Sequence, residues 1–187
     1  MRTKSHGRRL CHPAVLFSGG WKFFRSRPAP AARVKSDTVD LTSYLTATTP
    51  FLFDLALLIL RVALGVCFVV HGLGKLGLVG PGNMAGFTGW LQSLGLPFPA
   101  LQARVAMLSE LVGGTLITVG LGTRLAALFC LIAMIVAATI GHKGGGYLIT
   151  NDPPGNEYAL NLAILMVVLI LVGPGSLSLD HLLFAGR

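Results

Sequence analysis

Charged side chains are scarce in this sequence of 187 residues. Asp, Glu, Lys and Arg make up 12% of it, whereas 53% of the residues are hydrophobic and the mean hydropathy is +0.72. Soluble domains carry about 25% charged residues, so this chain has too few to cover a water-soluble globule of its size. A soluble enzyme is therefore not expected. An intrinsically disordered chain is excluded for the same reason, because so much apolar surface must be buried.

Acidic residues are especially rare: seven stand against fifteen Lys and Arg, a formal net charge of +8. Residues 1–50 hold nine basic and two acidic residues, a net of +7, whereas residues 51–187 hold six and five, a net of +1. We predict a basic, disordered extension over residues 1–49 and a membrane domain over residues 50–187. A transit peptide, rich in Arg and Ser and poor in acids, is the alternative for the extension. Nucleic-acid binding is not expected, because the domain itself is nearly neutral.

Cysteine is also rare, and the three present, Cys11, Cys67 and Cys130, have no CxxC spacing. Neither a disulfide framework nor a thiolate metal site is therefore predicted. The sequence also lacks a P-loop, a GxSxG element and an HExxH motif, which are common signatures of nucleotide binding, serine hydrolysis and zinc catalysis. We expect no metal and no covalent cofactor. A haem between His71 and His142 is disfavoured, because neither segment has paired histidines.

Long apolar runs are what the sequence does contain. Four of them span residues 51–70, 101–121, 125–140 and 158–172. A membrane-spanning helix needs about 20 residues, so the first two qualify directly and the last two need their flanks. The last two also lack the polar stripe that a helix of a soluble bundle would show. We predict an all-α integral membrane protein with a bundle of four transmembrane helices.

The connections between these runs add two predictions. Met84, Phe87, Leu91 and Leu94 recur at helical spacing around Trp90, which favours a short interfacial helix between the first two spans. Only three residues link the second and third spans, so these must be antiparallel neighbours. The basic N-terminal tail favours the cytoplasmic side of the cell membrane. With four spans, both termini are then predicted to be cytoplasmic.

Two charged residues lie near the middle of the first two spans, Arg61 and Glu110. Ionisable groups at membrane depth usually pair with one another inside the bundle. Matching their depths predicts a buried Arg61–Glu110 ion pair. Whether such a pair serves only to dock the helices or takes part in function stays open at this point.

A second polar group gathers at one end of the predicted bundle. Its members, by the alternation of the spans, are His71, Lys75, His142, Glu157 and Asn161. Histidine titrates near neutral pH, so this group is a candidate site for proton exchange or for a quinone head group. The alternative is an ordinary set of solvated polar residues at helix ends, because loops are generally polar.

Four stretches of the sequence resemble, in order, the signatures of the DoxX family of membrane proteins. They are LLILRVALGVCFVVHGLGKLGL, GFTGWLQSLGLPFPAL, SELVGGTLITVGLGTRLAAL and GNEYALNLAILMVVLILVGPGSLSLD. Together they run from about Leu57 to Asp180. The resemblance places the characteristic polar positions of the family on Arg61, His71, Gly72, Lys75, Glu110, Arg124, Glu157 and Asn161.

The DoxX family is named for the small subunit of a thiosulfate:quinone oxidoreductase. The resemblance therefore implies a four-helix membrane subunit of a quinone-linked redox complex, at most one subunit of an enzyme. Its expected partners are the lipid bilayer and an oxidoreductase subunit, and its expected ligand is a non-covalent quinone. The alternative is a non-enzymatic membrane protein, such as an assembly factor or a small-solute transporter. Transport would require a homo-oligomer, because four short helices leave little room for a pathway.

Overall fold

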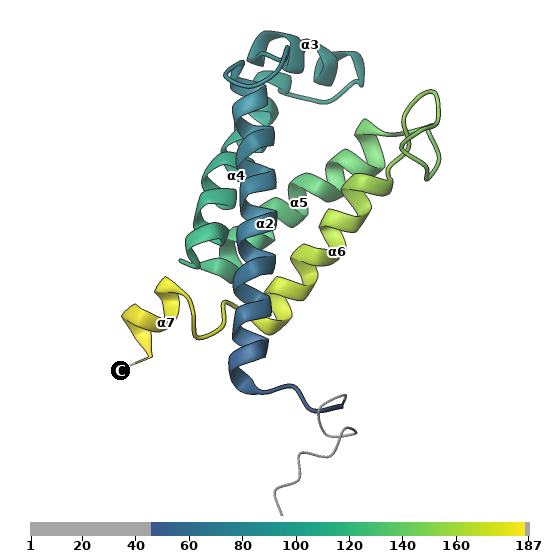
Figure 1. The fold of residues 1–187 in the computed structure, drawn as a ribbon. Helices are drawn as coiled ribbons and strands as arrows, with labels where there is room; N and C mark the ends of the chain where they lie inside the picture. The colour runs from purple at the N-terminus through teal and green to yellow at the C-terminus, as the bar shows by residue number, and fades with distance from the viewer. Residues whose placement is uncertain (1–45, 186–187) are drawn as a thin grey trace, which may run out of the picture. The chain divides into compact units, whose positions relative to one another are not determined.

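A computed structural model describes residues 46–185, and every described segment of regular structure is helical. Figure 1 shows the helices and their labels. They are α2 (Pro50–Leu76), α3 (Met84–Ser93), α4 (Pro99–Val119), α5 (Thr123–Val136), its π-helical extension η1 (Ala137–Gly141), α6 (Glu157–Val172) and α7 (Leu179–Phe184). Residues 1–45, for which we predict most of the N-terminal extension, lie outside the described residues.

Local sequence signals explain where the long helices begin and end. The Thr49 side chain accepts a hydrogen bond from the Leu52 amide at 3.3 Å and caps α2, whose first position is proline. α2 ends at Gly77, where φ is 79°, a left-handed conformation that glycine adopts without strain. Pro99 begins α4 in the same way that Pro50 begins α2. The helix boundaries therefore follow from proline, glycine and one hydroxyl cap.

Three helical segments are long and apolar enough to cross a membrane: Pro50–Leu76, Pro99–Val119 and Thr123–Gly141. α6 is apolar but has 16 residues, a length of about 24 Å against a hydrocarbon core of about 30 Å. The all-helical membrane class is confirmed, whereas the fourth span stays a prediction. α3 forms where the apolar spacing predicts a helix, but its place at the membrane interface stays a prediction. The orientation of the two termini also stays a prediction.

α2 and α4 pack closely because glycines face one another. A Cβ atom at Gly65 would lie 2.5 Å from the carbonyl oxygen of Gly114, and one at Gly72 would lie 2.9 Å from the Leu111 amide nitrogen. Neither position has room for a side chain, which is typical of closely packed membrane helices. Because higher numbers on α2 meet lower numbers on α4, the two helices are antiparallel in a fixed register.

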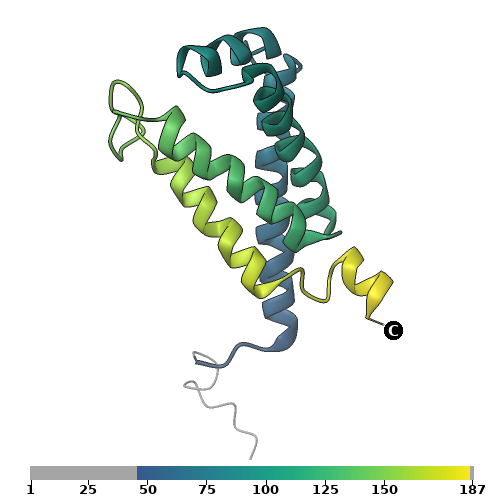
Figure 2. The same cartoon turned by 180° about the vertical axis from the view of Figure 1, so that it is seen from behind.

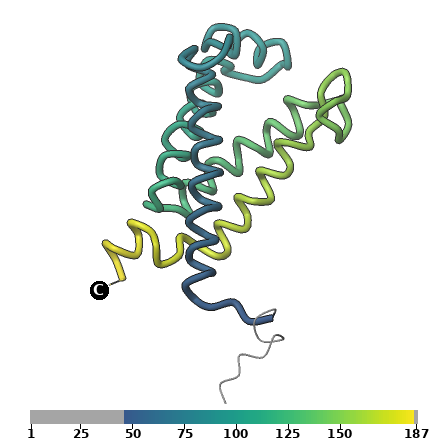
Figure 3. The backbone as a smooth tube through the Cα atoms, viewed as in Figure 1, coloured from purple at the N-terminus to yellow at the C-terminus, as the bar shows by residue number. Residues whose placement is uncertain are grey.

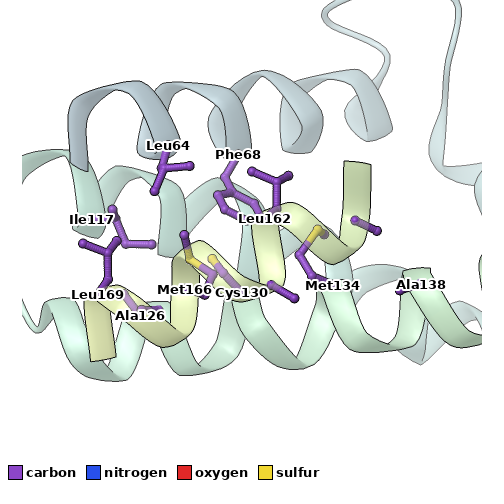
Figure 4. Packing of buried hydrophobic residues seen from close by; sticks show 13 residues of the cluster. Leu64, Phe68, Ile117, Ala126, Cys130, Met134, Ala138, Leu162, Met166 and Leu169 are labelled. Atoms are coloured by element: carbon purple, nitrogen blue, oxygen red, sulfur yellow. The ribbon is translucent and has the colours of Figure 1, made fainter. Parts of the chain in front are cut away.

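The buried core joins α2 and α4 to α5 and α6. Figure 4 shows side chains from all four helices interdigitating. The labelled members are Leu64, Phe68, Ile117, Ala126, Cys130, Met134, Ala138, Leu162, Met166 and Leu169. Phe68, Ile117, Met166 and Leu169 have no exposed surface, so this core holds the two helix pairs together.

The two helix pairs separate toward one end of the bundle. α4 and α5 are joined by the short turn after Gly120 and, from there, diverge toward α3 (Figure 2). The backbone trace in Figure 3 shows α5 and α6 leaning away from α2 and α4 at that end. We call the end near α3 the open end and the opposite one, at the α4–α5 turn, the turn end. The divergence leaves room at the open end for a cavity.

Candidate functional site

A cavity of about 490 Å³ lies at the open end, bounded by α2, α3, α4, α5, η1 and α6. We call it the α3 pocket. Ligand pockets typically measure about 300–1,000 Å³ and combine apolar walls with a few polar groups. Aromatic and aliphatic side chains make up most of these walls. Its titratable side chains are His71, Lys75, Glu110, His142 and Tyr158.

Lys75 and Glu110 form an ion pair in the wall of the α3 pocket. The Glu110 side chain is 5% exposed and that of Lys75 is 18% exposed. The Lys75 ammonium also lies 4.9 Å from the centre of the Phe87 ring of α3, a favourable cation–π distance. Residues from three helices thus hold one positive charge at the edge of an apolar cavity.

The predicted Arg61–Glu110 pair is wrong, because the register of α2 and α4 places the two residues at different depths. Arg61 reaches the turn end, where its Nη2 donates to the carbonyl oxygen of Leu177 and its Nη1 lies against Gly120. Gly120 is ten positions beyond Glu110 on α4, which is about 15 Å along the helix. The prediction used the middle of each apolar run as a depth marker. α2 continues past its run to Leu76, so Lys75 is the residue that reaches Glu110.

Tyr158, a residue that the sequence analysis did not single out, links two side chains of α2. Its hydroxyl lies 3.1 Å from His71 Nε2 and 2.6 Å from Cys67 Sγ, and the His71 and Tyr158 ring centres are 5.5 Å apart. A phenol can donate one hydrogen bond while it accepts others. The hydroxyl can therefore bridge the thiol and the imidazole in one hydrogen-bonded chain. Its only sequence signal is its position at the start of α6, opposite His71.

The five residues predicted to gather at one end are divided between the pocket and its surroundings. His71, Lys75 and His142 line the α3 pocket. The His142 Nδ1 donates to the carbonyl oxygen of Pro154 at 3.0 Å. Glu157 instead accepts from the Ile149 amide at 3.2 Å, and Asn161 is exposed on α6. Neither of these two lines the pocket.

α3 covers the pocket with two aromatic rings. Phe87 and Trp90 stack with ring centres 5.9 Å apart, and both line the pocket. A Cβ atom at Gly141 would lie 2.9 Å from the Trp90 ring, so the indole rests directly on the η1 backbone. A second hollow, lined by Asn83 and the residues around it, lies against the same wall. His71 and Lys75 border both hollows.

A separate polar cluster at the turn end fixes the C-terminal segment. Asp54 accepts from the backbone amide of Ser176 at 2.9 Å and from its hydroxyl. Asp180 accepts from the amides of Gly122 and Thr123 at 2.7 and 3.1 Å, which caps α5. The Nε and Nη1 atoms of the fully buried Arg61 have no hydrogen-bond partner within residues 46–185. We assign this cluster a structural role, because its hydrogen bonds join chain segments.

No group of three or more His, Cys, Asp or Glu side chains within the described part of the chain is placed to hold a metal ion. The polar groups of the α3 pocket are instead hydrogen-bond donors and acceptors beside an apolar volume. Such a site fits a small organic ligand with a polar head.

Comparison with known proteins identifies relatives across most of the chain. The sequence model of the family described as DoxX matches residues 56–143. "Inner membrane protein YphA" of Escherichia coli is 33% identical over 133 residues, which cover 67% of this chain and 88% of YphA. "Putative oxidoreductase CatD" of Bacillus subtilis is 32% identical over 136 residues, 72% of this chain and 92% of CatD. No solved structure matches this chain significantly.

Proposed function

The chain belongs to the DoxX family of membrane proteins, and on that premise we propose that it is the membrane subunit of a quinone-linked redox system. The observation that carries the proposal is the α3 pocket, an apolar cavity of about 490 Å³ with a lysine–glutamate pair in its wall. The name of the relative "Putative oxidoreductase CatD" also supports a redox role.

Quinone reduction consumes two electrons and two protons for each hydroquinone formed. In this proposal a partner oxidoreductase supplies the electrons, and side chains of the α3 pocket handle the protons. Lys75 donates a hydrogen bond to one quinone oxygen, and Tyr158, hydrogen-bonded to His71, serves the other. Protons are replaced from the second hollow, since His71 and Lys75 border both hollows.

The local environment strengthens such contacts. Glu110 holds the Lys75 ammonium in place and is itself almost fully buried. An apolar cavity excludes water, so a charged donor competes with little solvent for the ligand oxygen. The pocket therefore suits the recognition of carbonyl or hydroxyl oxygens on an otherwise apolar ring.

The fluorescence of Trp90 offers a direct binding assay. The chain has two tryptophans, Trp21 and Trp90, so a Trp21→Phe variant reports from Trp90, which lines the pocket. We expect decylubiquinone to quench this fluorescence saturably in detergent. A hydrogen bond from a charged donor contributes about 1.5–3 kcal/mol, so Lys75→Met should raise Kd at least about tenfold.

The matched control is Lys143→Met, because Lys143 is exposed and does not line the pocket. Its Kd should equal that of the parent. The double variant Lys75→Met/Glu110→Gln removes the unpaired carboxylate of the single variant and should bind as weakly. Quenching that rises linearly without saturation in the parent, or one Kd for all four proteins, would contradict the proposed function.

A further inference from the structure

The wall of the α3 pocket formed by α4 and α5 includes large apolar side chains that also form the outer surface of the bundle. Leu101 and Val105 of α4 are 61% and 52% exposed, and Phe129 and Ile132 of α5 are 50% and 51% exposed. All four line the pocket. The cavity is therefore continuous with a surface of large apolar side chains on two membrane-crossing helices.

We propose that the α3 pocket opens sideways into the bilayer between α4 and α5, and that its ligand has an apolar tail that stays in this opening. This inference rests on the proposed function and specifies where the ligand comes from and which part of it the protein selects. The ligand reaches the pocket from the lipid phase, with its ring directed inward toward Lys75 and its tail directed outward.

The arrangement of α4 and α5 provides the opening. The two helices are joined at the turn end and diverge toward α3 (Figure 2). The buried side of α5 is directed at the core through Ala126, Cys130 and Met134. Its opposite side is exposed within residues 46–185, where Ile132 and Ile135 are 51% and 48% exposed. In a membrane, such a surface contacts lipid tails, or a ligand tail of the same chemistry.

The side of the pocket that faces α3, in contrast, is covered by side chains. Phe87 and Trp90 of α3 stack over the pocket, and Trp90 rests on Gly141 of η1. A ring that moved in along the bundle axis would have to displace this aromatic pair and the Lys75 contact with Phe87. A ring that moved in between α4 and α5 meets mainly aliphatic and aromatic side chains, with Gln102 and Ser109 as the polar exceptions on α4. The lateral route therefore disturbs fewer contacts.

The test uses a variant that narrows the opening between α4 and α5 and leaves the polar residues of the pocket unchanged. Ile132→Trp places a large ring in the opening, and Ile135→Trp is its control on the same helix. Both parent side chains are about half exposed, at 51% and 48%, but Ile135 does not line the pocket. Binding of radiolabelled decylubiquinone and of its ring without a tail is followed in proteoliposomes. Size-exclusion profiles confirm that both variants fold.

The expected result is that Ile132→Trp slows association of decylubiquinone by about tenfold, within the range over which association rates vary among variants of one binding site, whereas Ile135→Trp leaves it unchanged. Binding of the tail-less ring at equilibrium should be the same in both variants. As a second measurement, a photoreactive group at the tail end should label α4 and α5 at the opening, as mapped by mass spectrometry.

Two results overturn the inference. If Ile132→Trp binds the tailed probe as fast as the parent and labelling falls on α3, the ligand arrives from the end and the proposed function survives. If the parent binds neither probe, the proposed function fails, and the lateral route fails with it.

Discussion

The ion pair between Lys75 and Glu110 gives the sharpest stability prediction. Glu110 is 5% exposed and Lys75 18% exposed, so removing one partner leaves a buried charge with no counter-charge. Breaking a buried pair in this way typically costs about 3–5 kcal/mol. We expect that cost for Lys75→Met, because Glu110 lies midway along α4 and its side chain is almost fully buried.

Substitution of the other partner, Glu110→Gln, is expected to lower the free energy of unfolding by less. Lys75 lies one residue before the end of α2, so in Glu110→Gln its flexible side chain can turn its ammonium outward to solvent. The double variant leaves no unpaired charge. Its loss of unfolding free energy should be smaller than the sum of the two single losses by at least about 2 kcal/mol, because residues in contact are coupled. Unfolding in mixed micelles at increasing denaturing-detergent fraction measures all four free energies.

A second cycle with Arg61→Met and Glu110→Gln is the control. These residues are separated by about 15 Å along α4, since Arg61 lies against Gly120, and their effects should add within about 0.5 kcal/mol. Coupling of Glu110 to Arg61 but not to Lys75 would contradict the observed ion pair. That result would restore the pairing expected from depth alone and require a different register of α2 and α4.

Three further predictions follow from the same contacts. Gly65→Ala should abolish the folded monomer on size-exclusion chromatography, because the new Cβ would lie 2.5 Å from a backbone oxygen, whereas Gly89→Ala, which meets nothing within 4 Å, should not. Asp180→Ala removes the cap of α5 and should cost about 0.5–2 kcal/mol, seen as faster proteolysis after α6; Asp152→Ala, at an exposed loop position, is the control. Tyr158→Phe loses the bonds to His71 and Cys67 and should weaken decylubiquinone binding in the fluorescence titration without loss of fold.

Much of the fold was accessible from the sequence because its signals are local. The apolar runs located α2 and α4, although α2 continues six residues past its run to Leu76. The three-residue link made α4 and α5 neighbours, and helical spacing located α3 at residues 84–93. Each of these inferences needed only residues adjacent in the chain.

The site was less accessible because it depends on register between helices. The contact between Gly65 and Gly114 fixes how far α2 slides along α4, and no local pattern gives that value. Arg61 of the expected pair and Lys75 of the observed pair are about four helical turns apart on α2. Tyr158 was not predicted for a related reason. Its role depends on contacts with α2, and no pattern in its own segment indicates them.

The presence of quinone in the purified protein tests the central claim most directly. Wild-type protein and the folded double variant Lys75→Met/Glu110→Gln would be purified in a mild detergent and extracted with organic solvent. Mass spectrometry would then quantify quinone per polypeptide. We expect quinone bound to the wild-type protein and depleted in the variant. Absence of quinone from the wild-type protein, or equal amounts in both, would contradict it.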